Sequence, residues 1–131
     1  MKKLFLAVLI LISPVLCCNA EVSDGINWLH IAPNNYIDQD GITGTTDRYG
    51  FSFLLKSYNK GQYEPIEGRQ VLYTLGQYEI DCLKNKYKIG TIDSYDDNGF
   101  FLNGDYNRYA QFQPIVSGTA VSAAARKLCK P

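Results

Sequence analysis

The fold of this chain is decided by one stretch, Gln77-Tyr-Glu-Ile-Asp-Cys82-Leu-Lys-Asn-Lys-Tyr87-Lys-Ile-Gly-Thr-Ile-Asp-Ser-Tyr95. In it, two segments that alternate apolar and polar residues flank the polar turn Lys84-Asn-Lys86. Alternation with a period of two is typical of antiparallel strands that bury one face. The stretch therefore predicts a β-hairpin that turns Tyr78, Ile80 and Cys82 toward the core.

The first twenty residues have the features of a secretory signal peptide. Met1-Lys-Lys3 is basic, Leu4–Ile12 is an apolar run, and small residues precede a cut that is expected after Ala20. We expect residues 1–20 to be removed and residues 21–131 to form a single exported domain. Lipid attachment at Cys17 or Cys18 is the alternative, and it would tether the domain to a membrane without changing its fold.

Removal of the signal peptide leaves two of the four cysteines, Cys82 in the hairpin and Cys129 near the C-terminus. An even number of cysteines in an oxidising compartment predicts disulfide pairing, and two cysteines allow a single connectivity. We therefore expect a Cys82–Cys129 disulfide. Two free thiols, or a bridge between two molecules, are the alternatives.

Before the hairpin turn, further segments show the alternation and the flanking turn residues of strands. Leu72 and Thr74 are expected to share the face of Tyr78, and Gly76 is expected to mark a bulge or a bend in that strand. Asn59–Glu67 is expected to be the longest loop. The expected strands are Ile26–Ala32, Tyr36–Asp38, which Ile42–Thr46 continues or closes, Asp47–Tyr58 and Gly68–Leu83.

After the hairpin, Asp96-Asp-Asn-Gly99 predicts a tight turn. One or two last strands are expected in Phe100–Leu102 and Tyr106–Phe112, on either side of Asn103-Gly-Asp105. These segments complete an antiparallel sheet of about six strands.

The C-terminal segment Ser117–Cys129 predicts a helix. Its apolar residues recur at helical spacing, and Ser117 or Thr119 can cap its first turn. The predicted fold class is therefore α+β, a twisted antiparallel sheet with one C-terminal helix packed on it and tethered by a disulfide. The apolar stripe consists of Val121, Ala124, Ala125 and Leu128.

Composition and motifs argue against several classes of function. Without Lys2 and Lys3, 11 basic and 13 acidic side chains remain, whereas a nucleic-acid-binding domain is usually strongly basic. The single histidine, His30, has no Gly-x-Ser-x-Gly nucleophile motif near it. The chain also lacks the Cys and His pairs of a zinc site. We predict no catalytic residue, metal site or cofactor, and we expect the chain not to be an enzyme.

The chain from about Ile26 to Cys129 carries, in order, Trp28, Tyr36-Ile-Asp38, Tyr78-Glu-Ile-Asp-Cys82 with its basic turn, Phe112-Gln-Pro-Ile115, and Ser117-Gly-Thr119 through Leu128-Cys129. In this order and spacing the motifs together resemble the bacterial surface-adhesin E family. The resemblance implies a disulfide between Cys82 and Cys129 that holds the helix to the sheet. It also implies a non-enzymatic adhesin for host matrix or serum proteins, in the periplasm or on the cell surface of a Gram-negative bacterium. One departure from the family pattern is Phe112, where the family often has tryptophan before Gln-Pro-Ile.

The candidate binding residues lie at the hairpin tip, where Lys84, Lys86 and Lys88 surround Tyr87. A basic tip with an aromatic residue can contact an acidic protein or polysaccharide; a solvated turn is the ordinary alternative. We expect a protein partner, no nucleic acid, and a membrane only if the chain is lipidated. An exposed sheet edge can also pair two copies into a homodimer. The alternative function is a periplasmic inhibitor or immunity-type protein that blocks a partner enzyme.

Overall fold

The computed structural model describes residues 25–45, 49–59, 61, 63–106 and 110–130. The expected signal peptide, with Cys17 and Cys18, lies outside these residues. Within the described ranges, no helix is both long enough and apolar enough to cross a lipid bilayer.

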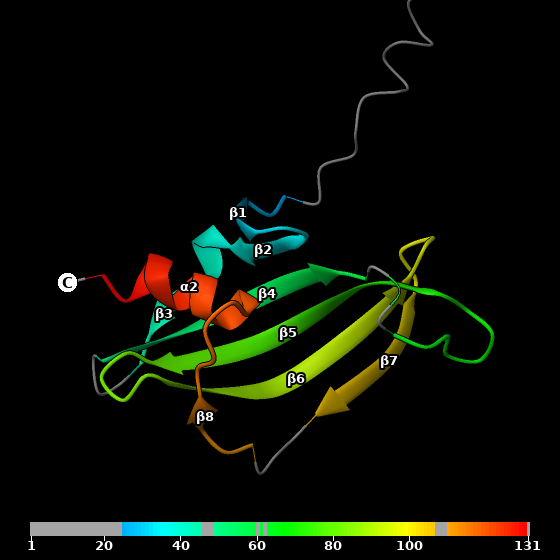
Figure 1. Cartoon of the computed structure of the whole chain (residues 1–131). Helices are drawn as coiled ribbons and strands as arrows, with labels where there is room; N and C mark the ends of the chain where they lie inside the picture. The colour runs from blue at the N-terminus through cyan, green and yellow to red at the C-terminus, as the bar shows by residue number, and fades with distance from the viewer. Residues whose placement is uncertain (1–24, 46–48, 60, 62, 107–109, 131) are drawn as a thin grey trace, which may run out of the picture.

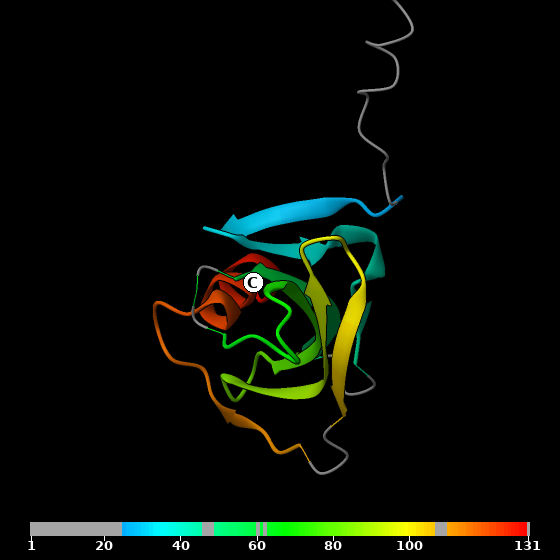
Figure 2. The ribbon, with the colours of Figure 1, turned by 90° about the vertical axis from the view of Figure 1, so that its right-hand side faces the viewer.

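An antiparallel sheet forms most of the described fold, and it curls around the helix that packs on one of its faces (Figure 1, Figure 2). Six strands lie in the order β1-β2-β4-β5-β6-β7, and short strands β3 and β8 pair with β4 and β6. The predicted α+β class is confirmed. The strands are β1 (Trp28–Ala32), β2 (Asn35–Asp38), β3 (Thr43–Gly44), β4 (Gly50–Tyr58), β5 (Val71–Asp81), β6 (Lys86–Asp96), β7 (Phe101–Tyr106) and β8 (Gln113–Pro114).

The hairpin of β5 and β6 forms where the sequence predicts it. Its two strands are eleven residues long each, and they are the fourth and fifth of the six strands in sheet order. The turn between them places Asn85 in the left-handed region, at φ 56°. The Asp81 carboxylate accepts a hydrogen bond from the Lys84 backbone N–H at 3.0 Å, which satisfies one donor of the turn.

The prediction of a bulge at Gly76 is wrong. Gly76 pairs in regular register with Leu55 of β4 and Ile92 of β6. A Cβ atom on Gly76 would lie 2.5 Å from Cε1 of Tyr78, so the missing side chain makes room for that ring. The bulge lies on β6 instead, because Gln77 pairs with Thr91 while Tyr78 pairs with Ile89.

A second register shift, at Leu72, changes which side chains of β5 point toward the core. Val71 is buried, whereas Leu72 is 37% exposed, because the pairing of β5 with β6 shifts between Val71 and Tyr73. The prediction that Leu72 shares the face of Tyr78 is therefore wrong, and Thr74, which is buried, follows the prediction. A bulge changes which face a side chain takes, since side chains alternate along a strand.

The segment after the Asp96–Gly99 turn forms one strand, β7, that runs through Asn103 and Gly104. Gly104 permits close approach of the neighbouring strand, because a Cβ atom there would lie 2.8 Å from Oδ1 of Asp93. Residues 110–112 lie outside any strand, and residues 107–109 are outside the described ranges. Of the second strand expected at Tyr106–Phe112, Tyr106 is the last residue of β7, and β8 comes only after that segment.

The helix α2 (Ala120–Leu128) has Thr119 rather than Ser117 as its N-cap. The Thr119 hydroxyl accepts a hydrogen bond from the Ser122 N–H at 3.2 Å and donates one to the Val116 carbonyl at 2.7 Å. Arg126 and Lys127 in the last turn lie at the negative end of the helix dipole. The N-cap and these two charges therefore stabilise the two ends of this short helix.

The hydrophobic core lies between α2 and the strands beneath it, and the Cys82–Cys129 disulfide links the two layers with a Cα–Cα distance of 5.5 Å. The predicted disulfide is thereby confirmed. Burial of one Ile, Leu or Phe side chain contributes about 1.5–3 kcal/mol. The buried core cluster comprises Ile37, Phe53, Leu55 and Ile80 of the sheet with Val121 and Ala124 of the helix.

Candidate binding surface

A row of aromatic side chains crosses the face of the sheet that is turned away from α2. Each of the six main strands contributes one ring, and the alternation of strand side chains places these rings opposite the buried Ile37 and Leu55. Successive ring centroids are 5.1, 6.0, 5.8, 5.0 and 5.9 Å apart. We call this set the aromatic row: His30, Tyr36, Tyr58, Tyr73, Tyr95 and Phe101.

The centre of the aromatic row holds the cation of Lys56. Its Nζ lies 4.5 Å from the ring centroid of Tyr73, 5.1 Å from that of Tyr58 and 5.2 Å from that of Trp28. Each such cation–π contact contributes about 0.5–1 kcal/mol at an exposed site. Among the described residues, Lys56 forms no salt bridge. The ammonium group is therefore held by aromatic faces rather than by a carboxylate.

Two carboxylates on the same face have other roles. Asp38, which pairs with Trp28 across β1 and β2, accepts hydrogen bonds from the backbone N–H groups of Asp40 and Gly41 in the short 3-10 turn η1 (Gln39–Gly41). Asp93 lies near Tyr95, where burial first, and then this carboxylate, raises the pKa of the phenol above its ordinary value. The charge of Lys56 is thus not neutralised by direct contact with either group.

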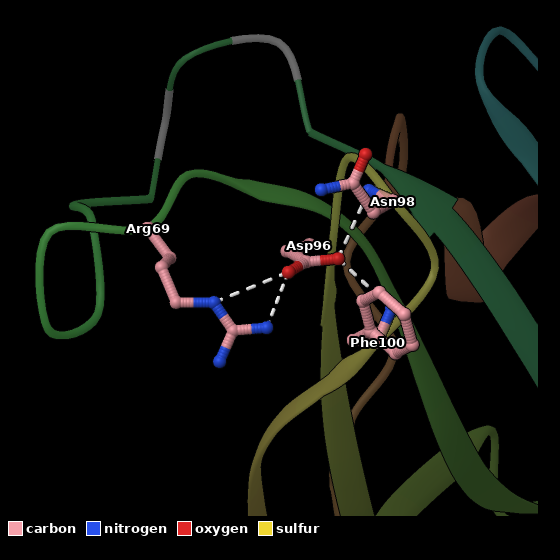
Figure 3. A network of polar contacts seen from close by, with 4 residues as sticks. All are labelled: Arg69, Asp96, Asn98 and Phe100. Atoms are coloured by element: carbon pink, nitrogen blue, oxygen red, sulfur yellow. Dashed lines mark hydrogen bonds and ion pairs between the residues drawn. The ribbon is translucent and has the colours of Figure 1, made fainter.

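A polar network fixes the end of the aromatic row at the β6–β7 turn (Figure 3). The buried Asp96 carboxylate pairs with Arg69 through Oδ2 and accepts the N–H groups of Asn98 and Phe100 through Oδ1, at 2.9 and 2.8 Å. The hydrogen bond from Arg69 is the main cause that lowers the pKa of Asp96. Because Tyr95 and Phe101 flank this turn, the network also positions their rings.

The structure separates the residues predicted at the hairpin tip. Lys84 and Lys86 are exposed there, but Tyr87 is half-buried, with its ring stacked on Tyr78 at 6.4 Å against the core. Lys88 lies farther along β6, its Nζ 3.9 Å from Oε1 of Glu79 and 4.9 Å from the ring of Phe112. Two exposed lysines, Lys84 and Lys86, therefore remain at the tip itself.

Sequence reasoning missed the aromatic row and the role of Lys56. Alternation along β4 does place Lys56 and Tyr58 on one face, which is a signal in the sequence. Trp28 and Tyr73, however, come from other strands, and only strand order and register bring them to Lys56.

Surface hollows lie on both faces of the sheet. A hollow of about 380 Å³ lies beside the disulfide, and its lining includes Ile80, Cys82 and Ala125, which also dock the helix. A smaller one, of about 110 Å³, is lined by Trp28, Tyr36, Lys56 and Tyr58. In the part of the chain that the structure describes, no three His, Cys, Asp or Glu side chains gather to hold a metal ion.

A family model described as surface-adhesin protein E matches residues 28–130, nearly all of the described fold. The chain belongs to the surface-adhesin protein E family. Membership of a family of surface proteins implies an exported location. No curated protein matches the chain significantly.

Solved structures of Haemophilus influenzae protein E share this adhesin fold. One is 17% identical over 83% of this chain and 86% of that chain, with a TM-score of 0.57. Its selenomethionine form is 18% identical over 83% and 88%, with a TM-score of 0.61. Protein E of non-typeable Haemophilus influenzae is 18% identical over 84% and 78%, with a TM-score of 0.59. At identities this low, the structural likeness shows the fold alone. The ligand of this chain has to be inferred from its own surface.

Proposed function

We propose that this protein is an exported, non-enzymatic adhesin that binds a host matrix or serum protein. The observation that carries the proposal is the match to the surface-adhesin protein E family over residues 28–130. The Cys82–Cys129 disulfide supports export, because disulfides form and persist in oxidising compartments outside the cytoplasm. The expected location is the periplasm or the cell surface of a Gram-negative bacterium.

The location is tested by protease accessibility on intact cells, combined with the mass of the mature N-terminus. An accessible, surface-displayed product supports adhesion. A soluble periplasmic product that begins near Glu21 contradicts cell-surface adhesion. It would favour the periplasmic inhibitor or immunity-type function instead.

The first candidate contact for the protein partner is the hairpin tip. Lys84 and Lys86 are exposed there, and their positive charges complement an acidic partner, whereas Lys88 already lies near Glu79. Tyr87 contributes through its packing beneath the tip rather than through direct contact. We expect the double variant Lys84→Glu/Lys86→Glu to bind immobilised human matrix and serum proteins more slowly than the parent, as measured by biolayer interferometry. Lys127→Glu/Lys130→Glu, at the C-terminal end of the helix, is the matched double charge reversal.

A second copy of the chain is the other proposed partner. The sheet ends in β1 and β7, and β7 exposes more than half of Phe101 and of Tyr106. Exposed apolar edge strands readily pair with another strand. Sedimentation velocity on the purified domain should therefore show a dimer that Tyr106→Lys weakens; a monomer at all concentrations would exclude it.

A further inference from the structure

We propose that the hollow around Lys56 binds a sugar residue that carries a carboxylate, of the uronic acid class. The hollow lies on the open face of the sheet and measures about 110 Å³. Its walls are the rings of Trp28, Tyr36 and Tyr58, and Lys56 provides the cation. This site is separate from the basic hairpin tip.

Charge complementarity is the first argument for an anionic ligand. The Lys56 ammonium group has three rings within 5.2 Å and, among the described residues, no salt bridge. Aromatic faces stabilise a cation but leave its N–H donors without strong acceptors. An incoming carboxylate would accept a charge-assisted hydrogen bond from Nζ, which is about twice as strong as a neutral one.

The size and chemistry of the walls favour a single sugar ring over a peptide. Pockets for drug-sized ligands measure about 300–1,000 Å³, so a hollow of this volume takes only one small ring. Phenol and indole groups offer both an apolar surface for the C–H groups of a sugar and hydrogen-bonding groups for its hydroxyls. A peptide would instead need a long groove or a sheet edge for its backbone.

The chain carries its own probe for this site. Trp28 is the single tryptophan of the sequence, and its ring lies 5.2 Å from the Lys56 Nζ. A ligand that enters the hollow should therefore change the intrinsic fluorescence. The ligands to be titrated are methyl β-D-glucuronide and methyl β-D-glucoside, which differ only in the carboxylate at C6.

We expect a saturable fluorescence change with the glucuronide, and binding about tenfold weaker or more with the neutral glucoside, since an interaction of about 1.4 kcal/mol is worth a factor of ten. Lys56→Gln should weaken glucuronide binding by a similar factor, whereas Lys56→Arg should retain most of it. Lys127→Gln on α2 removes the same charge from the other face of the sheet and should bind like the parent. Circular dichroism confirms that each variant is folded.

Equal binding of the two glycosides would overturn the proposal, because the carboxylate would then not be recognised. So would unchanged binding by folded Lys56→Gln. An acidic peptide such as tetraglutamate that displaces the glucuronide at equal concentration would assign the site to peptides instead. The glycoside comparison uses the unaltered protein, so it decides the question even if a variant fails to fold. All these measurements use purified domain, so a failure here leaves the adhesin proposal, tested on cells, standing.

Discussion

Gly76 shows at the scale of one residue how an absent side chain shapes the core. Tyr78 must fit beside it, with its ring stacked between Phe53 at 6.0 Å and Tyr87 at 6.4 Å. Burial, together with neighbouring phenols, raises the pKa of Tyr78 to about 12, so the ring stays neutral at ordinary pH. The ring therefore cannot move aside without leaving its stack.

We accordingly predict that Gly76→Ala lowers the free energy of unfolding by about 1–3 kcal/mol through overpacking. Urea denaturation measures it. Gly90→Ala is the matched control, because the nearest atom to its new Cβ is the Gln77 carbonyl oxygen at 3.8 Å, an ordinary contact. Equal effects of the two substitutions would show that lost backbone freedom, and not the Tyr78 ring, explains the loss.

Asp96 makes stability depend on pH. Its pKa is lowered in the folded state, first by the hydrogen bond from Arg69 and further by the N–H groups of Phe100 and Asn98. A carboxyl group with a depressed folded-state pKa stabilises the fold above its unfolded-state pKa of about 4. That stabilisation is lost as the pH falls through the folded-state pKa.

The prediction is that Asp96→Asn is less stable than the parent at pH 7, and that this difference shrinks at acidic pH, where the parent carboxylate becomes protonated. Chemical denaturation at pH 7, 5 and 3 measures both stabilities. Asp97→Asn, the exposed neighbour, should match the parent throughout. A constant difference between Asp96→Asn and the parent at all three pH values would sink this explanation.

At the scale of one element, the N-cap of α2 depends on one hydrogen bond, which the Thr119 hydroxyl accepts from the Ser122 N–H. We predict that Thr119→Ala costs about 1 kcal/mol, the usual value of an N-cap hydrogen bond. Ser117→Ala, two residues earlier and also exposed, should cost much less, because the Ser122 N–H bonds to Thr119. Thermal unfolding followed by circular dichroism compares the two. A larger loss of stability for Ser117→Ala than for Thr119→Ala would show that Ser117 is the N-cap residue.

Elements of regular alternation could be predicted from the sequence, whereas their irregularities could not. The β5–β6 hairpin and α2 follow the spacing of apolar residues, which is a local property. The shifts at Leu72 and on β6 depend on the pairing of two strands, so nothing in either strand alone locates them. A glycine within a strand often marks a bulge, which is why the sequence predicts one at Gly76. In the structure, this position instead lacks a side chain because the Tyr78 ring occupies the space.

At the scale of the whole molecule, the candidate site exists only because six strands lie in one order. The basic tip could be predicted because its lysines are neighbours in the sequence. Lys56 meets Trp28 and Tyr73 because β4 lies between β2 and β5, with β1 beyond β2. Sites assembled in this way need the strand order before the residues can be grouped. The Cys82–Cys129 bond is the exception, since counting cysteines replaces knowledge of the topology.

The same disulfide sets the stability of the whole domain. It closes a chain segment with a sequence separation of 47, and a loop of that size contributes about 4 kcal/mol in the chain-entropy model. Domains of this size have a total stability of about 5–15 kcal/mol, so the disulfide contributes a large share of that stability. The nine-residue helix is also too short to persist in water without docking.

We therefore predict that reduction with alkylation, and separately the double variant Cys82→Ser/Cys129→Ser, each lower the free energy of unfolding by about 4 kcal/mol. Urea denaturation followed by Trp28 fluorescence and by far-ultraviolet circular dichroism measures the loss. The double variant avoids the unpaired thiol that a single substitution would leave free to join two molecules. Agreement between the two treatments would assign the loss to the cross-link itself, since they alter the side chains differently. A loss below about 1 kcal/mol in both would mean that packing of Val121 and Ala124 on the sheet holds the helix without the bond.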